Sequence, residues 1–340
     1  MTSAITNLTL RDLGSDWDAK WDELVGASPE CGLMQSSAWA EFKRLEGYET
    51  HRFGFFNDEE LIGGANLYDY PYTGREGFLI CPEGPLLPWQ DTETSRACLR
   101  LLQTKAHEIA ETNGGLGLRI EPHLTPPAPS ILRNWKRAPI DLTPVHTLVL
   151  DIAGTPESIL AQMKPKGRYN LKLADKHGVT VRQSRNINDL QTFYALFKET
   201  AGRNGFFAEP YGFFLNLSSV YFPKNLGELF IAEWQGETLA AILVTYCGMR
   251  STYLYGGSSN QNRQVMPNYL LQWSAVLESR RRGCTEYDFF GYDPFGQTDH
   301  LYAGISRFKT QFGGRRMDSI GARDFIFYDR LADKIAGELS

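Results

Sequence analysis

The sequence has few cysteines, and none is arranged for a metal or a disulfide framework. Only five occur in 340 residues; they are widely spaced and form no CxxC pair. An odd, scattered set is typical of reduced thiols, so we expect a cytoplasmic protein with neither a zinc site nor disulfides. The N-terminal residues lack the basic and then apolar run of a signal peptide, and no apolar stretch is long enough to span a membrane.

Motifs for covalent and metal catalysis are also lacking. There is no GxSxG motif, and the six histidines show neither metal-ligand spacing nor a plausible cysteine partner. The net charge of −5 excludes wholesale coating of nucleic acid, so any such contact must be local. No long heptad run indicates a coiled coil. These absences favour a reaction that needs no protein nucleophile and no metal.

A strand–loop–helix–strand unit organises the second half of the chain. Residues 252–255 and 286–290 have the composition of strands. Between them, Pro267 suits the first turn of a helix, and Gly283 suits its end after three arginines. The pattern predicts two neighbouring strands with a helix across them.

This unit resembles the acyl-CoA-binding half of an N-acetyltransferase fold, except in its loop. Such a fold needs a glycine-rich loop before the helix, because bare backbone N–H groups must hold a pyrophosphate. Here residues 262–267 contain no glycine, and Pro267 has no N–H to donate. We therefore expect an acyltransferase scaffold that does not bind CoA.

The same pattern of elements occurs twice. Residues 53–67 and 230–244 each predict a hairpin with an acidic turn. Residues 77–121 and 252–291 each predict a strand, a loop, a helix stopped by glycine and a second strand. A connector with six of the 17 prolines, residues 122–144, separates the halves. The repeat predicts a duplicated α/β domain.

Short motifs follow one another along nearly the whole chain. They are Gln35-Ser36-Ser37-x-Trp39-x-x-Phe42-Lys43, Gly84-Pro85, Leu118-Arg119-Ile120-Glu121-Pro122, Lys164-Pro165-Lys166-Gly167-Arg168-Tyr169-Asn170-Leu171, Lys176-His177-Gly178-Val179, Tyr255-Gly256-Gly257-Ser258, Pro267-Asn268-Tyr269, Tyr287-Asp288-Phe289 and Phe308-Lys309-x-x-Phe312-Gly313-Gly314. As a set they resemble the Fem family (FemABX), the aminoacyl-tRNA-dependent transferases that build peptidoglycan cross-bridges.

The resemblance implies an α/β fold of two tandem acetyltransferase-like (GNAT-like) domains, with mixed sheets flanked by helices and without the coiled-coil arm of larger members. It implies a first domain of residues 1–145 plus 322–340 for the acceptor, and a second of residues 146–321 for the aminoacyl-tRNA. The donor would be aminoacyl-tRNA, with no CoA and no other cofactor. The acceptor would be a peptidoglycan precursor, either a UDP-linked muropeptide or its lipid-linked form, which would bring the protein to the membrane surface.

The chemistry of such a transfer needs placement and charge more than a nucleophile. An aminoacyl ester is already activated, so the enzyme must position an amine and stabilise an oxyanion. Lys309, between Phe308 and Phe312, is the first candidate for that charge, and the resemblance places the Phe-Lys pair at the reaction centre. Glu121 could accept the proton of the amine. The alternative for Lys309 is a strand lysine beside two core aromatics. The alternative for Glu121 is a carboxylate that caps a strand end or pairs with Arg119.

Acceptor contacts rest more on the resemblance than on spacing. The expected substrate-binding residues are Lys43, Trp39, Arg119, Arg203, Tyr255 and Asn268. Lys43 could equally be a solvated helix lysine, and Tyr255 a core tyrosine at its strand end. Glu209 and Phe213 stand where family members can carry a basic residue and a tyrosine, so the acceptor stays open.

A basic run in the second half is the candidate for tRNA contact, because phosphate contacts dominate such affinity. It comprises Lys164, Lys166, Arg168 and Lys172, followed by Lys176 and Arg182, with Arg280 to Arg282 further on. The alternative is a solvated helix face. Two other functions stay open: an N-acyltransferase with another activated carrier and a non-peptidoglycan acceptor, and a non-catalytic binding module on the same fold.

Overall fold

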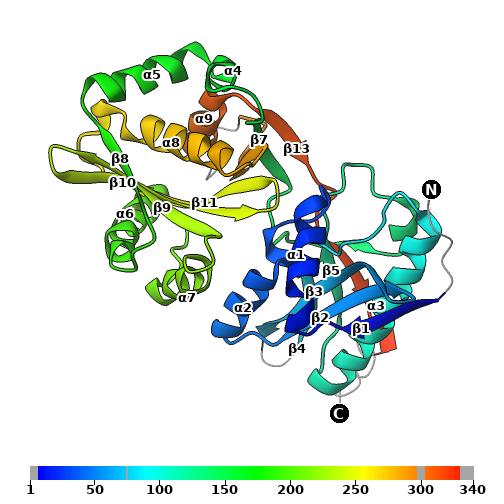
Figure 1. Ribbon diagram of the computed structural model, residues 1–340. Helices are drawn as coiled ribbons and strands as arrows, with labels where there is room; N and C mark the ends of the chain where they lie inside the picture. Colours follow the sequence, from blue (N-terminus) through cyan, green and yellow to red (C-terminus); the bar gives the residue numbers. More distant parts are fainter. Residues whose placement is uncertain (1–6, 74–75, 297–302, 330–340) are drawn as a thin grey trace. The chain divides into compact units, whose positions relative to one another are not determined.

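The chain folds into two compact units, each built on a seven-stranded sheet (Figure 1). The structure is a computed structural model that describes residues 7–73, 76–296 and 303–329. Unit 1 comprises Met1–Val145 and Asp318–Ser340, and unit 2 comprises His146–Met317.

Unit 1 has the strand order β1-β2-β3-β4-β5-β14-β6. Its elements are β1 (Leu8–Asp12), α1 (Asp18–Ala27), α2 (Ser37–Leu45), β2 (Thr50–Asn57), β3 (Glu60–Thr73), β4 (Glu76–Pro82), α3 (Thr92–Asn113), β5 (Gly117–Glu121), β6 (Lys136–Arg137) and β14 (Arg323–Ile326). Apolar side chains of α3 pack with those of β2 to β5 in one core.

Local signals explain where these helices begin and end. The Ser36 hydroxyl accepts a hydrogen bond from the N–H of Trp39 at 3.1 Å, and Asp91 likewise caps α3. Helix α3 ends at Gly114, whose φ of +82° suits glycine. The predicted hairpin of β2 and β3 and the predicted helix α3 with its glycine stop are therefore confirmed.

Unit 2 has the order β13-β7-β12-β11-β10-β9-β8. Its elements are β7 (His146–Asp151), α4 (Pro156–Gln162), α5 (Pro165–Lys176), β8 (Thr180–Ser184), α6 (Asp189–Asn204), α7 (Tyr211–Tyr221), β9 (Gly227–Trp234), β10 (Glu237–Cys247), β11 (Arg250–Ser258), α8 (Pro267–Arg281), β12 (Glu286–Gly291), α9 (Ala303–Lys309) and β13 (Arg315–Asp318). Helices α6 and α7 lie on one side of the sheet, and α5 and α8 on the other (Figure 1).

The two sheets repeat the same strand senses, which confirms the predicted duplication. In unit 1, β2–β3 and β3–β4 are antiparallel and β4–β5 is parallel. In unit 2, β9–β10 and β10–β11 are antiparallel and β11–β12 is parallel. The next strand in each sheet comes from a different place in the chain. In unit 1, β5 pairs with β14, which comes after the whole of unit 2 in the sequence. In unit 2, β12 pairs with β7, the first strand of that unit.

Some elements differ from expectation. Helices α7 and α9 and strands β1, β6, β8, β13 and β14 were not predicted. Tyr255 lies inside β11, which continues to Ser258, and Lys309 ends helix α9, so the alternative of a strand lysine is wrong. Helix α6 packs so closely on this last part of β11 that residue 257 must be glycine: a Cβ there would lie 2.3 Å from the backbone nitrogen of Phe197. In the described part of the chain, no helix has the length and apolarity to cross a membrane.

Candidate active site

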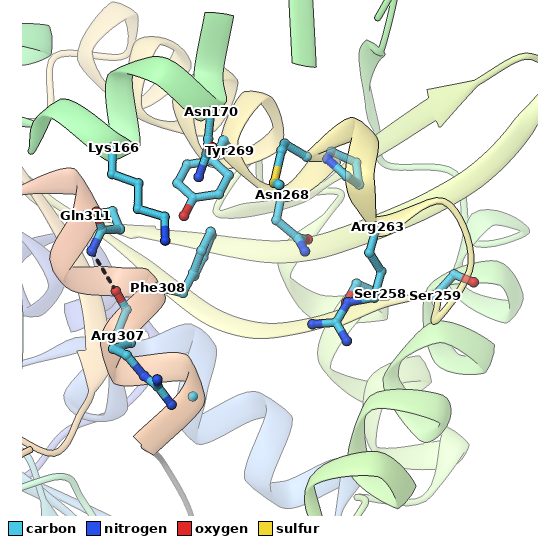
Figure 2. A pocket seen from close by; sticks show the side chains of 13 residues that line it. Lys166, Asn170, Ser258, Ser259, Arg263, Asn268, Tyr269, Arg307, Phe308 and Gln311 are labelled. Carbon is cyan, nitrogen blue, oxygen red and sulfur yellow. Dashed lines mark hydrogen bonds between the residues drawn. The ribbon is translucent and has the colours of Figure 1, made fainter. Parts of the chain in front are cut away.

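A polar pocket of about 350 Å³ opens in unit 2 at the start of helix α8 (Figure 2). Its walls come from α5, the end of β11 with the following loop, the first turn of α8, and α9. Besides the hydroxyls of Ser258, Ser259 and Tyr269, the polar side chains that line it are the cations Lys166, Arg263 and Arg307 and the amides Asn170, Asn268 and Gln311. Three cations and three amides in one pocket suit a ligand that carries both phosphates and a polar base.

Helical spacing brings these side chains together. Lys166 and Asn170 are four residues apart on α5 and face the same way. Arg307 and Gln311 have the same spacing, and the Gln311 amide donates to the Arg307 carbonyl at 3.2 Å. Of the lining residues, Lys166, Asn268 and Phe308 were predicted from the sequence. Most of the others belong to the same motifs or to the loop before α8, so the motifs could have indicated them; Gly304 and Arg307, on α9, had no such signal.

An aromatic wall closes one side of the pocket. Tyr269 and Phe308 meet edge to face with ring centroids 5.2 Å apart. Both also contact Phe312, which is fully buried, at 5.7 and 5.4 Å. Because Phe312 is anchored in the core, it holds the two lining rings in fixed orientations.

Lys309 follows Phe308 directly and is 5% exposed. Its ammonium donates to the Gly291 carbonyl at 2.7 Å and lies 5.5 Å from the centre of the Tyr253 ring. Within the described residues, it donates to no other acceptor. Burial lowers the pKa of Lys309 to about 7, and the nearby Asp288 carboxylate opposes that shift. Lys309 does not line the pocket itself; it is a desolvated amine with a pKa near neutral, one residue from the pocket wall.

Two predicted substrate residues of unit 2 have structural partners. The Arg203 guanidinium donates to the Ser258 carbonyl at 3.1 Å and to Asn260 Oδ1 at 2.7 Å, so it fastens the loop that lines the pocket. Tyr255 packs edge to face against Phe213 and Phe214 at 5.7 and 5.1 Å. Arg203 does not line the pocket, and the ring contacts of Tyr255 fit the alternative of a core tyrosine.

In unit 1, Lys43 and Trp39 lie one turn apart on α2, and both are buried. The Lys43 ammonium lies 3.6 Å from the centre of the Tyr48 ring, so the alternative of a solvated lysine is wrong. The indole N–H of Trp39 is buried and has no acceptor among the described residues. A cation and an unsatisfied donor on one helix face are an arrangement that an anionic ligand could complete.

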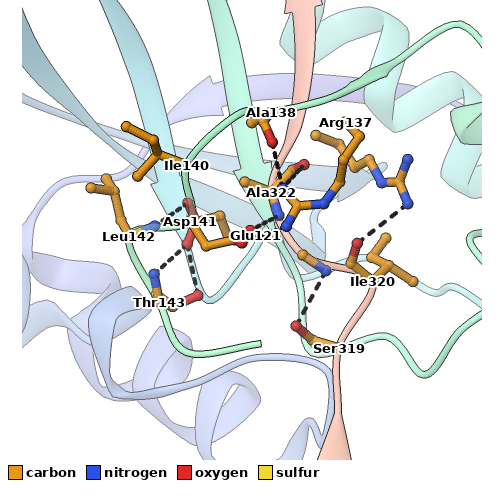
Figure 3. Close-up of polar contacts among 12 residues, drawn as sticks. Glu121, Arg137, Ala138, Ile140, Asp141, Leu142, Thr143, Ser319, Ile320 and Ala322 are labelled. Carbon is orange, nitrogen blue, oxygen red and sulfur yellow. Dashed lines mark hydrogen bonds and ion pairs between the residues drawn. The ribbon is translucent and has the colours of Figure 1, made fainter. Parts of the chain in front are cut away.

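Glu121 and Arg119, on β5, are both engaged in holding unit 1 together. Glu121 accepts hydrogen bonds from the backbone N–H groups of Leu142 and Thr143 at 3.0 and 2.7 Å (Figure 3). Burial raises the pKa of Glu121. Arg119 pairs with Asp324 of β14 at 2.6 and 2.9 Å. The geometry matches a carboxylate that caps a strand end, and a catalytic role for Glu121 stays a prediction.

In the basic run, the lysines and the arginines differ in whether their side chains have partners within the protein. Lys164, Lys166, Lys172 and Lys176 lie on α5 or just before it, and none of their ammonium groups forms an ion pair or hydrogen bond with a described residue. The arginines are engaged: Arg168 donates to the Met163 carbonyl, Arg182 binds Asp189 and Glu233, Arg280 donates to the Gly154 carbonyl, and Arg281 and Arg282 bind Glu278. These arginines therefore have partners within the protein, whereas the ammonium groups of the four lysines have none among the described residues; contact of either set with RNA stays a prediction.

Two mixed sheets with the same strand order, each flanked by helices, define a tandem N-acetyltransferase-like protein. The family model of the FemAB family matches residues 18–128, 136–237 and 226–329. The chain belongs to the FemAB family, which confirms the resemblance found in its motifs.

Relatives and solved structures agree with this assignment. Two proteins called lipid II:glycine glycyltransferase, from Staphylococcus saprophyticus and Staphylococcus aureus, are each 24% identical, with 91% of both chains covered. The crystal structure of FemX superposes with a TM-score of 0.85 at 22% identity and covers 96% of this chain and 99% of that one. A tandem GNAT protein from the clavulanic acid pathway has a TM-score of 0.57 at 11% identity, covering 94% and 98%. The expected fold class is confirmed.

Proposed function

We propose that the protein transfers an amino acid from aminoacyl-tRNA to an amine of a peptidoglycan precursor stem peptide, which forms a cross-bridge or branch. The observation that carries the proposal is the buried Lys309 ammonium, one residue after Phe308 of the aromatic wall of a cationic pocket. Membership of the FemAB family and the names of the glycyltransferase relatives support the same reaction class.

Lys309 stabilises the developing charge in this mechanism. The neutral amine attacks the ester carbonyl, a C–N bond forms, and the carbonyl oxygen becomes an oxyanion. The C–O bond to the ribose then breaks, and the ribose oxygen takes the proton that the amine loses. A buried ammonium acts strongly on the oxyanion, because little water screens it. The mechanism needs the charged form of Lys309, so kcat falls as the pH rises through about 7.

The pocket fits the terminal nucleotide of the donor. Its aromatic wall offers a surface for stacking a base, its amides can bind a base edge, and its cations can bind phosphates. At the start of α8, Met266 has a φ of +56° and Pro267 occupies the first helical position, where CoA enzymes place a glycine-rich loop. We therefore assign aminoacyl-tRNA, and not CoA, to unit 2.

The lysine face of α5 continues from this pocket. Lys166 lines the pocket, and Lys172 and Lys176 follow further along the helix. Tyr169 lies among them and is 64% exposed, which offers a further stacking surface. Helix α5 is therefore suited to the acceptor end of the tRNA.

The acceptor is assigned to unit 1 through Lys43 and Trp39. The relatives are named for lipid II, so their names favour a lipid-linked precursor over a nucleotide-linked one. A phosphate would meet both the Lys43 ammonium and the indole N–H of Trp39 on the same face of α2.

The function is tested by reconstitution. The protein is incubated with tRNA charged with single amino acids and with either lipid II or the UDP-linked muropeptide, and products are analysed by mass spectrometry. We expect one amino-acid mass to be added only with intact charged tRNA. Transfer from acetyl-CoA or a carrier-protein thioester would support the alternative acyltransferase. Binding of RNA or precursor without any product would support a binding module.

The lysine face makes a prediction about salt dependence. Replacing Lys164, Lys166 and Lys172 with glutamine should weaken tRNA binding and flatten the slope of log K against log salt by about 0.7–0.9 for each phosphate that is no longer neutralised. Lys105→Gln is the control, because Lys105 pairs with Glu108 on the surface of α3 and lies outside the basic run. The slope is measured by fluorescence titration at several salt concentrations. An unchanged slope in the lysine variants would make α5 a solvated helix face.

Lys43 makes a prediction about the acceptor. Lys43→Met should raise the acceptor KM by about tenfold or more, the effect of losing a charged hydrogen bond, while kcat changes less. Steady-state kinetics with variable acceptor at saturating donor measures both parameters. Lys105→Met is a control in unit 1, because Lys105 pairs with Glu108 on the surface of α3. A fall in kcat at constant KM would contradict phosphate binding by Lys43.

A further inference from the structure

The end of strand β12 contains a strained turn next to Lys309. Phe290 has a φ of +63°, which is rare and strained for a bulky side chain. The pairing of β12 with β7 shifts register between Asp288 and Gly291, so the strand bulges here. Bulges beside functional sites commonly re-aim backbone or side-chain groups.

Asp288 holds this turn in place. Its side chain is 4% exposed, and Oδ1 accepts a hydrogen bond from the Phe290 N–H at 2.7 Å. This is the pattern in which an aspartate caps the backbone two residues on and makes a left-handed residue tolerable. The turn directs the next carbonyl, that of Gly291, to the Lys309 ammonium at 2.7 Å. One side chain therefore determines where the ammonium is held.

The charged and polar groups near Lys309 come from few elements. Strand β12 contributes the Asp288 carboxylate, and β11 contributes the uncharged Tyr253 ring. The loop after β12 contributes Asp293, which accepts from the Phe295 N–H at 2.9 Å and whose own N–H is bound by Ser306. On α9 itself, Arg307 is exposed and lines the pocket. Of these groups, Asp288 is the one whose charge favours the protonated form of Lys309 against its burial.

We propose that Asp288 is a positioning residue for the transfer reaction and acts on it only through Lys309. It fixes the turn whose carbonyl receives the ammonium, and its buried carboxylate favours the charged form of that amine. The inference rests on the proposed role of Lys309 in stabilising the oxyanion.

Asp288→Asn tests the charge apart from the turn, because the amide oxygen can still accept from the Phe290 N–H. The pKa of Lys309 is measured in the full-length protein by NMR titration of its ε-carbon, assigned with Lys309→Met. We expect the midpoint to move to lower pH by about one unit, the effect of losing one nearby opposite charge. The alkaline limb of the kcat profile should move by the same amount. Asp288→Glu, which restores the charge, should reverse much of the shift.

Asp293→Asn is the matched control, because Asp293 is also a buried carboxylate that caps an N–H two residues on. It should leave the Lys309 midpoint unchanged. If Asp288→Asn lowers the yield of folded protein, Phe290→Gly is added, since glycine adopts the left-handed turn without help and leaves only the charge to be tested.

The outcomes separate the role of Asp288 as a positioning residue from the role of the Lys309 charge in catalysis. An unchanged Lys309 midpoint in folded Asp288→Asn would overturn the role of Asp288, whatever the activity. A shifted midpoint with an unshifted kcat profile would confirm the link between the two side chains but overturn the proposed use of the Lys309 charge in catalysis. Parallel shifts of both would support the inference.

Discussion

Lys309→Met is expected to lower kcat by about 10²–10³, the usual effect of losing one donor to an oxyanion. Methionine keeps most of the volume of lysine but removes the charge. The acceptor KM should change little, because the missing interaction forms mainly in the transition state. Single-turnover kinetics with charged tRNA measures the effect on the chemical step.

The same substitution is expected to raise stability. The pKa of Lys309 is about 7 in the folded protein and near its ordinary 10.5 when unfolded. The unfolded state therefore binds more protons between these pH values, so wild-type stability rises with pH through this window and is lowest below about pH 7. Methionine removes this penalty, and the variant should melt at a higher temperature than the wild type at about pH 6. At about pH 10 the difference should be much smaller.

Loss of turnover together with increased stability would distinguish a catalytic charge from a packing residue. Lys105→Met, on the surface of unit 1, should change neither property by much. Near-normal turnover in folded Lys309→Met would show that the reaction centre lies elsewhere, and Tyr255 and Glu121 would be the next residues to replace.

Arg119→Met is expected to destabilise unit 1 by about 3–5 kcal/mol, because it leaves the Asp324 carboxylate buried without its partner. Arg119 and Asp324 are both buried and joined by two hydrogen bonds of 2.6 and 2.9 Å. Because this pair joins β5 to β14, hydrogen exchange should accelerate most in these two strands. Exchange measured by mass spectrometry on peptides localises the effect to unit 1.

The double variant Arg119→Met/Asp324→Leu is the control for this prediction. It removes both charges and should recover most of the protection, since apolar side chains often replace a buried ion pair at little cost. If Arg119→Met leaves exchange unchanged and raises the acceptor KM, Arg119 binds substrate as the resemblance implies.

Sequence patterns predicted the elements whose signals are local. Pro267 at the start of α8, Gly114 at the end of α3 and the acidic turns of the hairpins act within a few residues, so they are visible without the fold. Helix α7 was missed because it is apolar on nearly all sides and shows little helical period.

The candidate site was only partly visible in the sequence. Lys166, Asn268 and Phe308 belong to short motifs and do line the pocket. Arg203, also expected to bind substrate, does not line this pocket; it binds the pocket loop through the Ser258 carbonyl, 55 residues away. A motif identifies a residue, but its contacts decide whether it reaches a ligand.

By itself the sequence identified the two repeated halves, the family and the Phe308-Lys309 motif, since these depend on the order of residues and on short spacings. Only the tertiary structure decided which charges are available and which are buried. Arg182 meets Glu233 across 51 residues and Arg119 meets Asp324 across 205, so neither pairing has a local signal. The lowered pKa of Lys309 arises the same way, because desolvation depends on every element packed around the amine and not on its neighbours in the chain.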